Sequence, residues 1–146
     1  MKRRFEGLRE AARSSSDEIP DGLFLVRIER VQYRWHEQKP FYALRFVVLE
    51  PQEFAGRVIS ARLYCTSRAL WKLSWFLRDF GYDTELFGRE EIDEKALLGL
   101  RGVLKISHTT VHGTRLINLE GFAPVSQWEE LAPISAAEVN RSEVGG

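Results

Sequence analysis

The stretch from Tyr33 to Tyr42, with the sequence YRWHEQKPFY, contains four aromatic rings and two cations and has no aliphatic residue. Aromatic rings stack on nucleobases for about 1–3 kcal/mol each, and the cationic side chains of arginine and lysine contact phosphates. The bases of a duplex are already stacked on one another, so exposed rings serve single strands rather than duplexes. The composition of this stretch therefore predicts a surface that binds single-stranded nucleic acid.

Residue patterns for catalysis or metal binding are missing from the sequence. His108 and His112 are four residues apart but belong to a strand-and-turn pattern, so their rings do not share a face as they would on a helix. Cys65 is the only cysteine, and no P-loop, GxGxxG or GxSxG motif occurs. We therefore expect a protein that is not an enzyme and that uses no metal and no cofactor.

Charge is segregated along the chain, although the formal net charge is zero. Residues 27–78 contain ten Lys or Arg and four Asp or Glu, whereas residues 79–100 contain two basic and seven acidic residues. A charge run is often only a solvated surface, which is one interpretation of both segments. The other interpretation is a basic face for an anionic partner, with a separate acidic segment beside it.

The length and composition predict one globular domain, because the chain has 146 residues of which 44% are hydrophobic. A single cysteine excludes an intramolecular disulfide. No apolar run approaches the roughly 18 residues of a membrane span, and the N-terminus has no apolar signal-peptide core. We therefore expect a cytoplasmic protein with no membrane partner.

Alternating apolar residues predict five strands, and a change to helical spacing predicts two helices between the third and fourth strands. The first strand shows a phase shift near Glu29 and Arg30, which indicates a β-bulge. Ser67 is the predicted N-cap of the first helix, and Gly81 its predicted stop. A two-residue turn at 112–113 joins the last two strands. The strands are expected at residues 23–35, 41–49, 58–65, 102–111 and 115–122, and the helices at 67–80 and 90–99.

This β-β-β-α-β-β order, with an extra short helix before the fourth strand, predicts a mainly β fold with a capping helix, namely a five-stranded OB-fold barrel. A small α+β sheet is the alternative, and it would not need the bulged first strand. We expect the barrel to span residues 18–125. Residues 1–17 are expected to be a flexible basic arm or short helix, and residues 126–146 a tail with a disordered end.

In such a barrel, side chains alternate between the interior and the outer face of the second and third strands, so the outer face is free to bind a ligand. Stacking on bases is expected from Tyr33, Trp35, Phe41 and Tyr64. Phosphate contacts are expected from Arg34, Lys39, Arg45, Arg62 and Lys105. Trp71 and Trp75 are four residues apart on a predicted helix, and we expect them to pack rather than to bind.

The rings and the cations of this face each have a structural alternative. Tyr33, Trp35 and Phe41 could form cross-strand aromatic pairs, covered by the N-terminal arm or by a second subunit. Arg45 and Arg62 would repel each other on adjacent strands unless an anion or a carboxylate lies between them. The carboxylates available for that role in the sequence are those of Glu29 and Glu50.

The scaffold positions resemble those of the phage and prophage single-stranded DNA-binding proteins, a family long described as a domain of unknown function. The likeness covers residues 18–124 and is carried by EIPDGLFLVRIERVQYRW and YALRFVVLEPQEFAGRVISARLY, by the leucine-rich helix that ends at Gly81, and by the close from Phe122 to Pro124. The resemblance implies an OB-fold protein that coats single-stranded DNA during phage-type replication or recombination.

Two kinds of function are therefore expected from the sequence. The first is a single-stranded DNA-binding protein, for which RNA is an equally acceptable ligand because stacking platforms accept both sugars. The second is an OB-fold subunit of a larger complex, with the aromatic face buried against another chain and with the acidic residues 79–94 and the N-terminal arm as contacts. The expected partners are a single strand, a further copy of the chain, or a replication or recombination protein.

Overall fold

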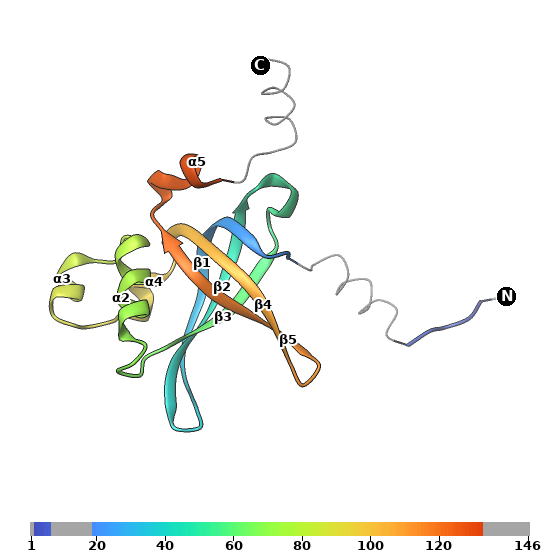
Figure 1. The fold of residues 1–146 in the computed structure, drawn as a ribbon, viewed down its shortest axis with the longest axis horizontal. Helices are drawn as coiled ribbons and strands as arrows, with labels where there is room; N and C mark the ends of the chain where they lie inside the picture. Colours follow the sequence, from blue (N-terminus) through green and yellow to red (C-terminus); the bar gives the residue numbers. More distant parts are fainter. Residues whose placement is uncertain (1, 7–18, 133–146) are drawn as a thin grey trace, which may run out of the picture.

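The computed structural model describes residues 2–6 and 19–132, and its main element is one antiparallel five-stranded sheet (Figure 1). The order of strands in the sheet is β3-β2-β1-β4-β5. The strands are β1 (Gly22–His36), β2 (Lys39–Glu50), β3 (Val58–Tyr64), β4 (Arg101–Val111) and β5 (Thr114–Ala123). The five strands predicted from the alternation of apolar residues are confirmed, as is the presence of helices between β3 and β4.

The edge strands β3 and β5 lie near each other but are not joined by a hydrogen-bonded ladder. The sheet is strongly curved and remains open (Figure 1). The architecture is therefore a mainly β fold with an open antiparallel sheet and a few short helices.

β1 is the longest strand because it pairs with a different neighbour at each end. Residues 22–27 pair with β4, and residues 25–36 pair with β2. The register against β2 shifts between Ile28 and Arg30, which confirms the bulge predicted there and leaves Glu29 without an opposite residue. A bulge bends and twists its strand, so β1 can serve both halves of the curved sheet.

The β1–β2 and β4–β5 hairpins close with two-residue turns in which both residues have positive φ, a geometry that matches the twist of the flanking strands. Glu37 and Gln38, with φ of 49° and 66°, join β1 to β2. His112 and Gly113, with φ of 50° and 80°, join β4 to β5 and confirm the predicted turn. The first hairpin thus reverses without a glycine.

Aromatic rings occupy the centre of the core, between the sheet and α2 (Leu70–Asp79). The ring centroid of Phe46 on β2 lies 6.3 Å from that of Phe76 and 6.0 Å from that of Phe80. The ring of Phe122 on β5 lies 5.4 Å from Phe76. Burying each such ring stabilises the fold by about 1.5–3 kcal/mol, so α2 is fixed against one end of the sheet, as expected for a capping helix.

The two ends of α2 were unequally predictable from local sequence. Ser67 is wrong as the N-cap, because the helix begins at Leu70 and is preceded by Ala69, which makes no side-chain cap. Gly81 is confirmed as the stop: its φ of 73° is left-handed, and its N–H donates to the carbonyl of Arg78 at 3.2 Å. Among the described helices, including this one of 10 residues, none is long and apolar enough to span a membrane.

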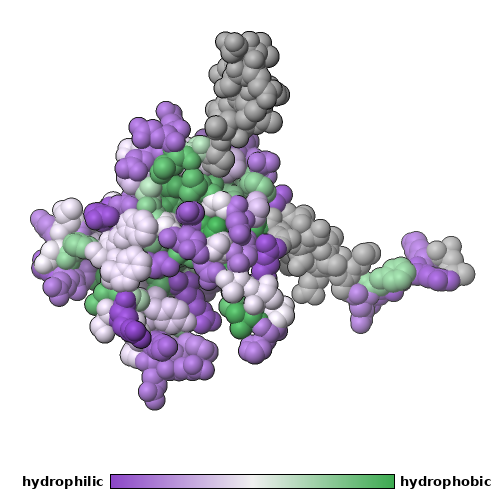
Figure 2. Space-filling model, in the orientation of Figure 1, coloured by the Kyte–Doolittle hydropathy of each residue, from purple (hydrophilic) through white to green (hydrophobic). Residues whose placement is uncertain are grey.

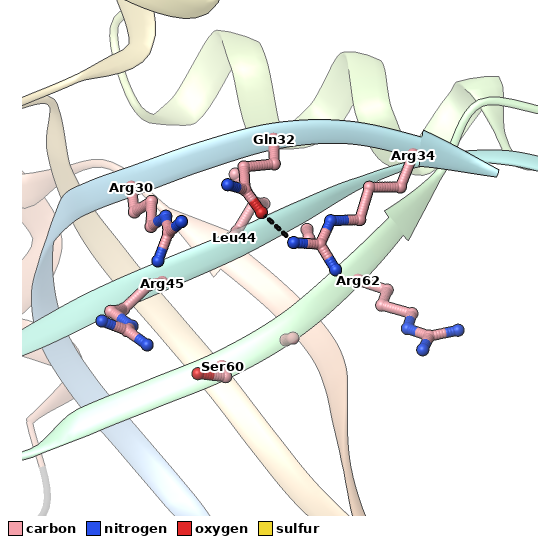
Figure 3. Close-up of a pocket in the computed structure, with 9 residues that line it drawn as sticks. Arg30, Gln32, Arg34, Leu44, Arg45, Ser60 and Arg62 are labelled. Atoms are coloured by element: carbon pink, nitrogen blue, oxygen red, sulfur yellow. Dashed lines mark hydrogen bonds between the residues drawn. The ribbon is translucent and has the colours of Figure 1, made fainter.

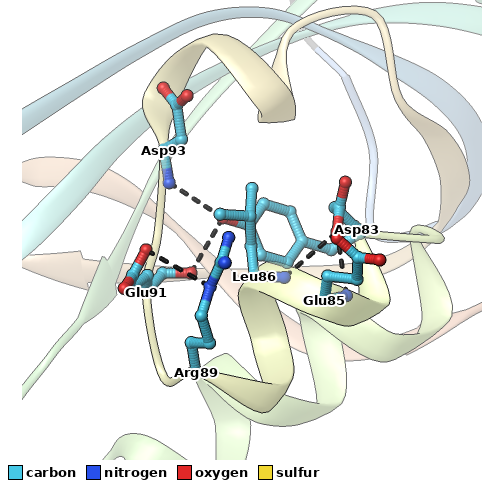
Figure 4. Close-up of polar contacts among 7 residues, drawn as sticks. Asp83, Glu85, Leu86, Arg89, Glu91 and Asp93 are labelled. Atoms are coloured by element: carbon cyan, nitrogen blue, oxygen red, sulfur yellow. Dashed lines mark hydrogen bonds and ion pairs between the residues drawn. The ribbon is translucent and has the colours of Figure 1, made fainter.

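The acidic segment after α2 forms two short helices where the sequence predicts one at residues 90–99. They are α3 (Thr84–Gly88) and α4 (Glu94–Leu97). The carboxylate of Asp83 accepts backbone N–H bonds at the start of α3 (Figure 4), and that of Asp93 accepts the N–H of Lys95 at the start of α4. Capping by these aspartates explains why each helix begins where it does.

The hydroxyl of Tyr82 holds the connection between α3 and α4. It donates to the carbonyl of Glu91 at 2.9 Å and accepts the N–H of Asp93 at 2.8 Å (Figure 4). The Tyr82 ring is itself buried in the core. The acidic segment is therefore fixed to the body of the protein by a buried side chain.

The fold continues past the boundary expected at residue 125. A 3-10 turn, η2 (Val125–Gln127), leads into α5 (Trp128–Leu131). Trp128 is only 8% exposed and packs in a second apolar cluster with Val103 and Ala123. Residues 2–6 form no helix or strand, and the remaining expectations for 1–17 and for 133–146 concern residues outside the described ranges.

Candidate nucleic-acid interface

The alternation of β1 divides the predicted site residues between two sides of the sheet. After the bulge, Arg34 points to the outer side together with Phe41, its partner on β2. Tyr33 points to the inner side together with Tyr42, which belongs to the core cluster. The residues predicted to form one stacking surface therefore belong to two surfaces.

The outer side of β1, β2 and β3 carries a group of cations that we call the arginine face. It consists of Arg30, Arg34, Arg45 and Arg62 (Figure 3). These side chains surround an open hollow of about 270 Å³ whose other lining residues include Gln32, Ala43 and Ser60. Small side chains between the arginines leave the backbone of the sheet as the floor of the hollow.

The register of the strands explains how the four arginines come together. Arg30 lies opposite Arg45 across the β1–β2 pair, and Arg45 lies opposite Ser60 across the β2–β3 pair. Arg62 lies opposite Ala43, two residues from Arg45 on the same face. Like charges on directly opposed residues destabilise a sheet, so the Arg30–Arg45 pair carries an electrostatic cost that an anion would relieve.

The arginine face has no carboxylate of its own. In the described part of the chain, none of its four guanidinium groups forms an ion pair, so the predicted alternative of pairing with Glu29 or Glu50 is not found. Arg34 donates to the Oε1 of Gln32 (Figure 3), and Arg62 donates to the hydroxyl of Tyr64 at 3.5 Å. Each guanidinium carries a positive charge and only hydrogen-bond donors, so this face is suited to an anionic ligand.

Phe41 lies on the outer side, as predicted, but is not available for stacking. Its side chain is only 4% exposed. The guanidinium of Arg62 lies 4.5 Å from its ring centroid, and the ring of Tyr64 lies 5.5 Å away. The expectation of an open stacking ring at Phe41 is therefore wrong, because cation–π packing covers it. Its position gives it a different use, which is to hold Arg62 in place.

The first hairpin's inner side carries exposed rings. Tyr33 is 43% exposed and Trp35 is 64% exposed, and their ring centroids are 6.1 Å apart. Tyr33 also lies 5.1 Å from Tyr42, which makes it part of a cross-strand aromatic pair, as the alternative interpretation predicted. Burial raises the pKa of Tyr42 to about 12, with a smaller contribution from the neighbouring Cys65.

The two predicted lysines differ in their relation to the arginine face. Lys39 shares the outer side of the hairpin with Arg34 and is exposed. Lys105 lies on β4 opposite Leu23, and Arg30 is seven residues farther along β1, which corresponds to about 23 Å of strand. Lys105 therefore does not belong with the four arginines.

Sequence reasoning omitted three polar residues of the hollow: Arg30, Gln32 and Ser60. The signal for Arg30 was present, because a bulge at Glu29 shifts the alternation of every later residue of β1. Reading that shift through to Gln32 and Arg34 would have placed all three on one side. The position of Ser60 depends on the pairing of β3 with β2, which local sequence does not specify.

The expectation that both helix tryptophans pack is correct only for one of them. Trp75 is half-buried, lies 5.3 Å from the ring of Phe122 and donates its indole N–H to Asp79 at 2.8 Å. Trp71 stacks on Trp75 at 6.3 Å but is 65% exposed. The outer surface of α2 therefore presents an indole to solvent.

Polar side chains that could serve catalysis or bind a metal are scattered. Within residues 2–6 and 19–132, no three His, Cys, Asp or Glu side chains are grouped closely enough to hold a metal ion. His108 instead contacts Asp21, with 2.5 Å between Nδ1 and Oδ1, and so ties β4 to the start of β1. Compared with the models of known protein families and with curated proteins, the chain shows no match.

Proposed function

We propose that the protein binds single-stranded DNA, without catalysis, through the arginine face. The observation that carries this proposal is the set of four guanidinium groups around one hollow, none of them paired with a carboxylate of the described residues. Arginine matches phosphate in charge and in the geometry of its donors, and phosphate contacts supply most of the affinity of non-specific nucleic-acid binding.

The arrangement of the strands supports this proposal. The order β3-β2-β1-β4-β5, with β3 near β5, is the order expected of an OB-fold barrel whose last pair of strands has not closed. In OB-folds the face of strands two and three, flanked by the first and last hairpin loops, binds oligonucleotides. The arginine face occupies the corresponding strands of this chain.

Bases would be contacted at the two ends of the arginine face. Tyr64 is half-buried beside Arg62, and its exposed part can meet one base. Trp35 extends from the other side of the first hairpin, where a strand leaving the arginine face past Lys39 would reach it. A flexible single strand can turn around such a hairpin edge, whereas a duplex cannot, and this is the reason for the proposed preference.

The proposed biological role is the coating of single-stranded DNA in replication or recombination of the phage type. It is supported by the resemblance of residues 18–124 to the phage single-stranded DNA-binding family. An RNA strand would present the same phosphates and stacking bases, so the comparison of DNA with RNA is part of the test.

The experiment that tests this proposal is a fluorescence anisotropy titration with a labelled thymidine oligonucleotide, a duplex of equal length and the matching uridine oligonucleotide. We expect the DNA single strand to bind and the duplex to bind far more weakly. The logarithm of the binding constant should fall with the logarithm of the salt concentration, with a slope of about −2.8 if all four arginines contact phosphates. Equal affinity for duplex, or a slope near zero, would contradict the proposal.

A further inference from the structure

A groove on the helical side of the molecule combines an apolar floor with an acidic rim. It lies between α2 and the α3–α4 segment and has a volume of about 580 Å³. Its apolar lining residues are Leu70, Leu73, Leu77, Phe87 and Ile92. Leu70 and Phe87 are 48% and 41% exposed, so part of this apolar floor is open to solvent. We call this feature the acidic groove.

The rim of the acidic groove is formed by carboxylates. Glu90 and Glu91 line it directly, and Glu94 lines the adjoining hollow beneath Tyr33. Arg89 is the one nearby cation in the segment before α4, and its Nε lies 3.8 Å from Glu91 Oε2 (Figure 4). The rim therefore keeps an excess of negative charge.

This rim has a fixed shape in the fold. The carbonyl of Glu91 accepts the hydroxyl of the buried Tyr82, and the N–H of Glu91 donates to the carbonyl of Leu86 at 2.9 Å. Asp83 caps α3 by accepting two backbone N–H bonds. A groove whose walls are held this way loses little conformational entropy when it binds a segment.

The segment Lys2–Phe5 of the same chain has the complementary chemistry. It places three cations, Lys2, Arg3 and Arg4, directly before Phe5, whose ring is 66% exposed. Figure 2 shows an apolar part among the hydrophilic atoms of the described N-terminal residues. Neither Phe5, with its exposed ring, nor any cation of this segment lines the groove of its own chain.

We infer that Lys2–Phe5 of one copy docks in the acidic groove of a second copy. Phe5 enters the apolar floor beside Leu70 and Phe87, and the three cations lie against Glu90 and Glu91. The two contacting surfaces differ, so the contact is heterologous and can continue from copy to copy as an open row. A segment this short buries little area, so each contact is weak and depends on protein concentration.

The test measures self-association of the full chain without nucleic acid, by sedimentation equilibrium over a range of protein concentrations. We expect the average mass to rise with concentration, beyond that of a dimer. Phe5→Ala should weaken association about tenfold or more, because it removes the buried ring. Leu98→Ala is the matched control: it also removes an exposed apolar side chain, 50% exposed but outside the groove, and should leave association unchanged.

Charge exchange provides a result that misfolding cannot imitate. The pair Arg3→Glu and Arg4→Glu should abolish association, and so should the pair Glu90→Arg and Glu91→Arg. An equimolar mixture of the two double variants should associate, because the acidic segment of one fits the basic rim of the other. A monomeric wild-type chain, normal association of Phe5→Ala, or a mixture that stays monomeric would overturn the inference.

NMR tests whether the groove binds the segment, and the dependence on protein concentration shows which copy supplies it. The first measurement uses a peptide of residues 1–6. When this peptide is added to isotopically labelled protein, we expect NMR shifts at Leu70, Phe87 and Glu90, and none with the Phe5→Ala peptide. The second measurement uses the full chain without peptide. If the NMR shifts of its groove residues change in Phe5→Ala but do not change with protein concentration, the segment docks within one chain, and this result would overturn the contact between copies. None of these measurements requires DNA binding, so their failure is distinguishable from failure of the proposed function.

Discussion

The two sides of the first hairpin differ in charge and in the exposure of their aromatic rings, although the residues of both sides alternate in one stretch of sequence. The outer side continues into the arginine face, where four guanidinium groups surround a hollow and none pairs with a carboxylate within residues 2–6 and 19–132. The inner side carries Tyr33 and Trp35. Tyr33 lines the adjoining hollow together with Glu90 and Glu94. The composition of the stretch therefore did not define one site, because alternate residues of a strand point to opposite sides of the sheet.

The comparison also teaches how rings are used on each side. On the outer side, Phe41 is covered by Arg62 and Tyr64 and stabilises their positions. On the inner side, Trp35 is mostly exposed, and its ring and that of Tyr33 are arranged edge to face. The ring that stabilises the fold and the ring that is free for a ligand are six residues apart.

The largest expected effect is the difference in the free energy of unfolding between variants that lack one or the other of these two rings. Phe41→Ala should lower the free energy of unfolding by about 3 kcal/mol, because it removes a buried ring from beneath Arg62. Trp35→Ala should change it by less than about 0.5 kcal/mol, because the indole is exposed. Urea denaturation of both variants measures the difference. Similar losses for both would break the distinction between a structural ring and a free ring.

The next effect tests the charge of the arginine face. Arg45→Glu combined with Arg62→Glu should weaken binding of a thymidine oligonucleotide about a hundredfold, or about 2.7 kcal/mol, since two phosphate contacts become repulsive. Lys105→Glu is the matched control, because it reverses an exposed charge of β4 that lies away from the hollow. Anisotropy titrations at one salt concentration measure both. An equal loss from Lys105→Glu would indicate a general charge effect rather than a defined face.

Alkaline pH should lower the free energy of unfolding through ionisation of Tyr42, which lies on the inner side. Its folded pKa of about 12 exceeds the ordinary value of 10.0, so its contribution to stability is complete below pH 10 and is lost as the pH rises from 10 toward 12. Tyr42→Phe should therefore flatten the decline of stability in that window. Urea denaturation at several pH values measures the slope, and an unchanged slope in Tyr42→Phe would contradict this role.

The smallest expected effect sharpens the argument that the arginine face is made for an anion. Arg30→Gln should raise the free energy of unfolding by about 0.5 kcal/mol at low salt, because it removes the like-charge pair with Arg45. The same variant should weaken DNA binding. Denaturation and anisotropy measured on one preparation reveal both changes, and a variant that loses stability as well as binding would argue against electrostatic cost at this position.

The strands were predictable because their signal is local. Alternation identified all five, the phase shift at Glu29 located the bulge, and His112 with Gly113 marked a tight turn. The helical boundaries were harder: Ser67 has the chemistry of a cap, but the helix begins at Leu70 and its first buried residue is Leu73. The burial of Trp128 was not predicted, because its partners Val103 and Ala123 belong to β4 and β5.

The sequence by itself determined the number of strands, the position of the bulge and the set of cations and rings available for binding, because these depend on neighbours a few residues apart. Tertiary structure alone decided which of them meet. Pairing across three strands assembled Arg30, Arg45 and Arg62, and covered Phe41, while packing of α2 against the acidic segment created the acidic groove. Such contacts join residues distant in sequence, and their register is set by the whole core.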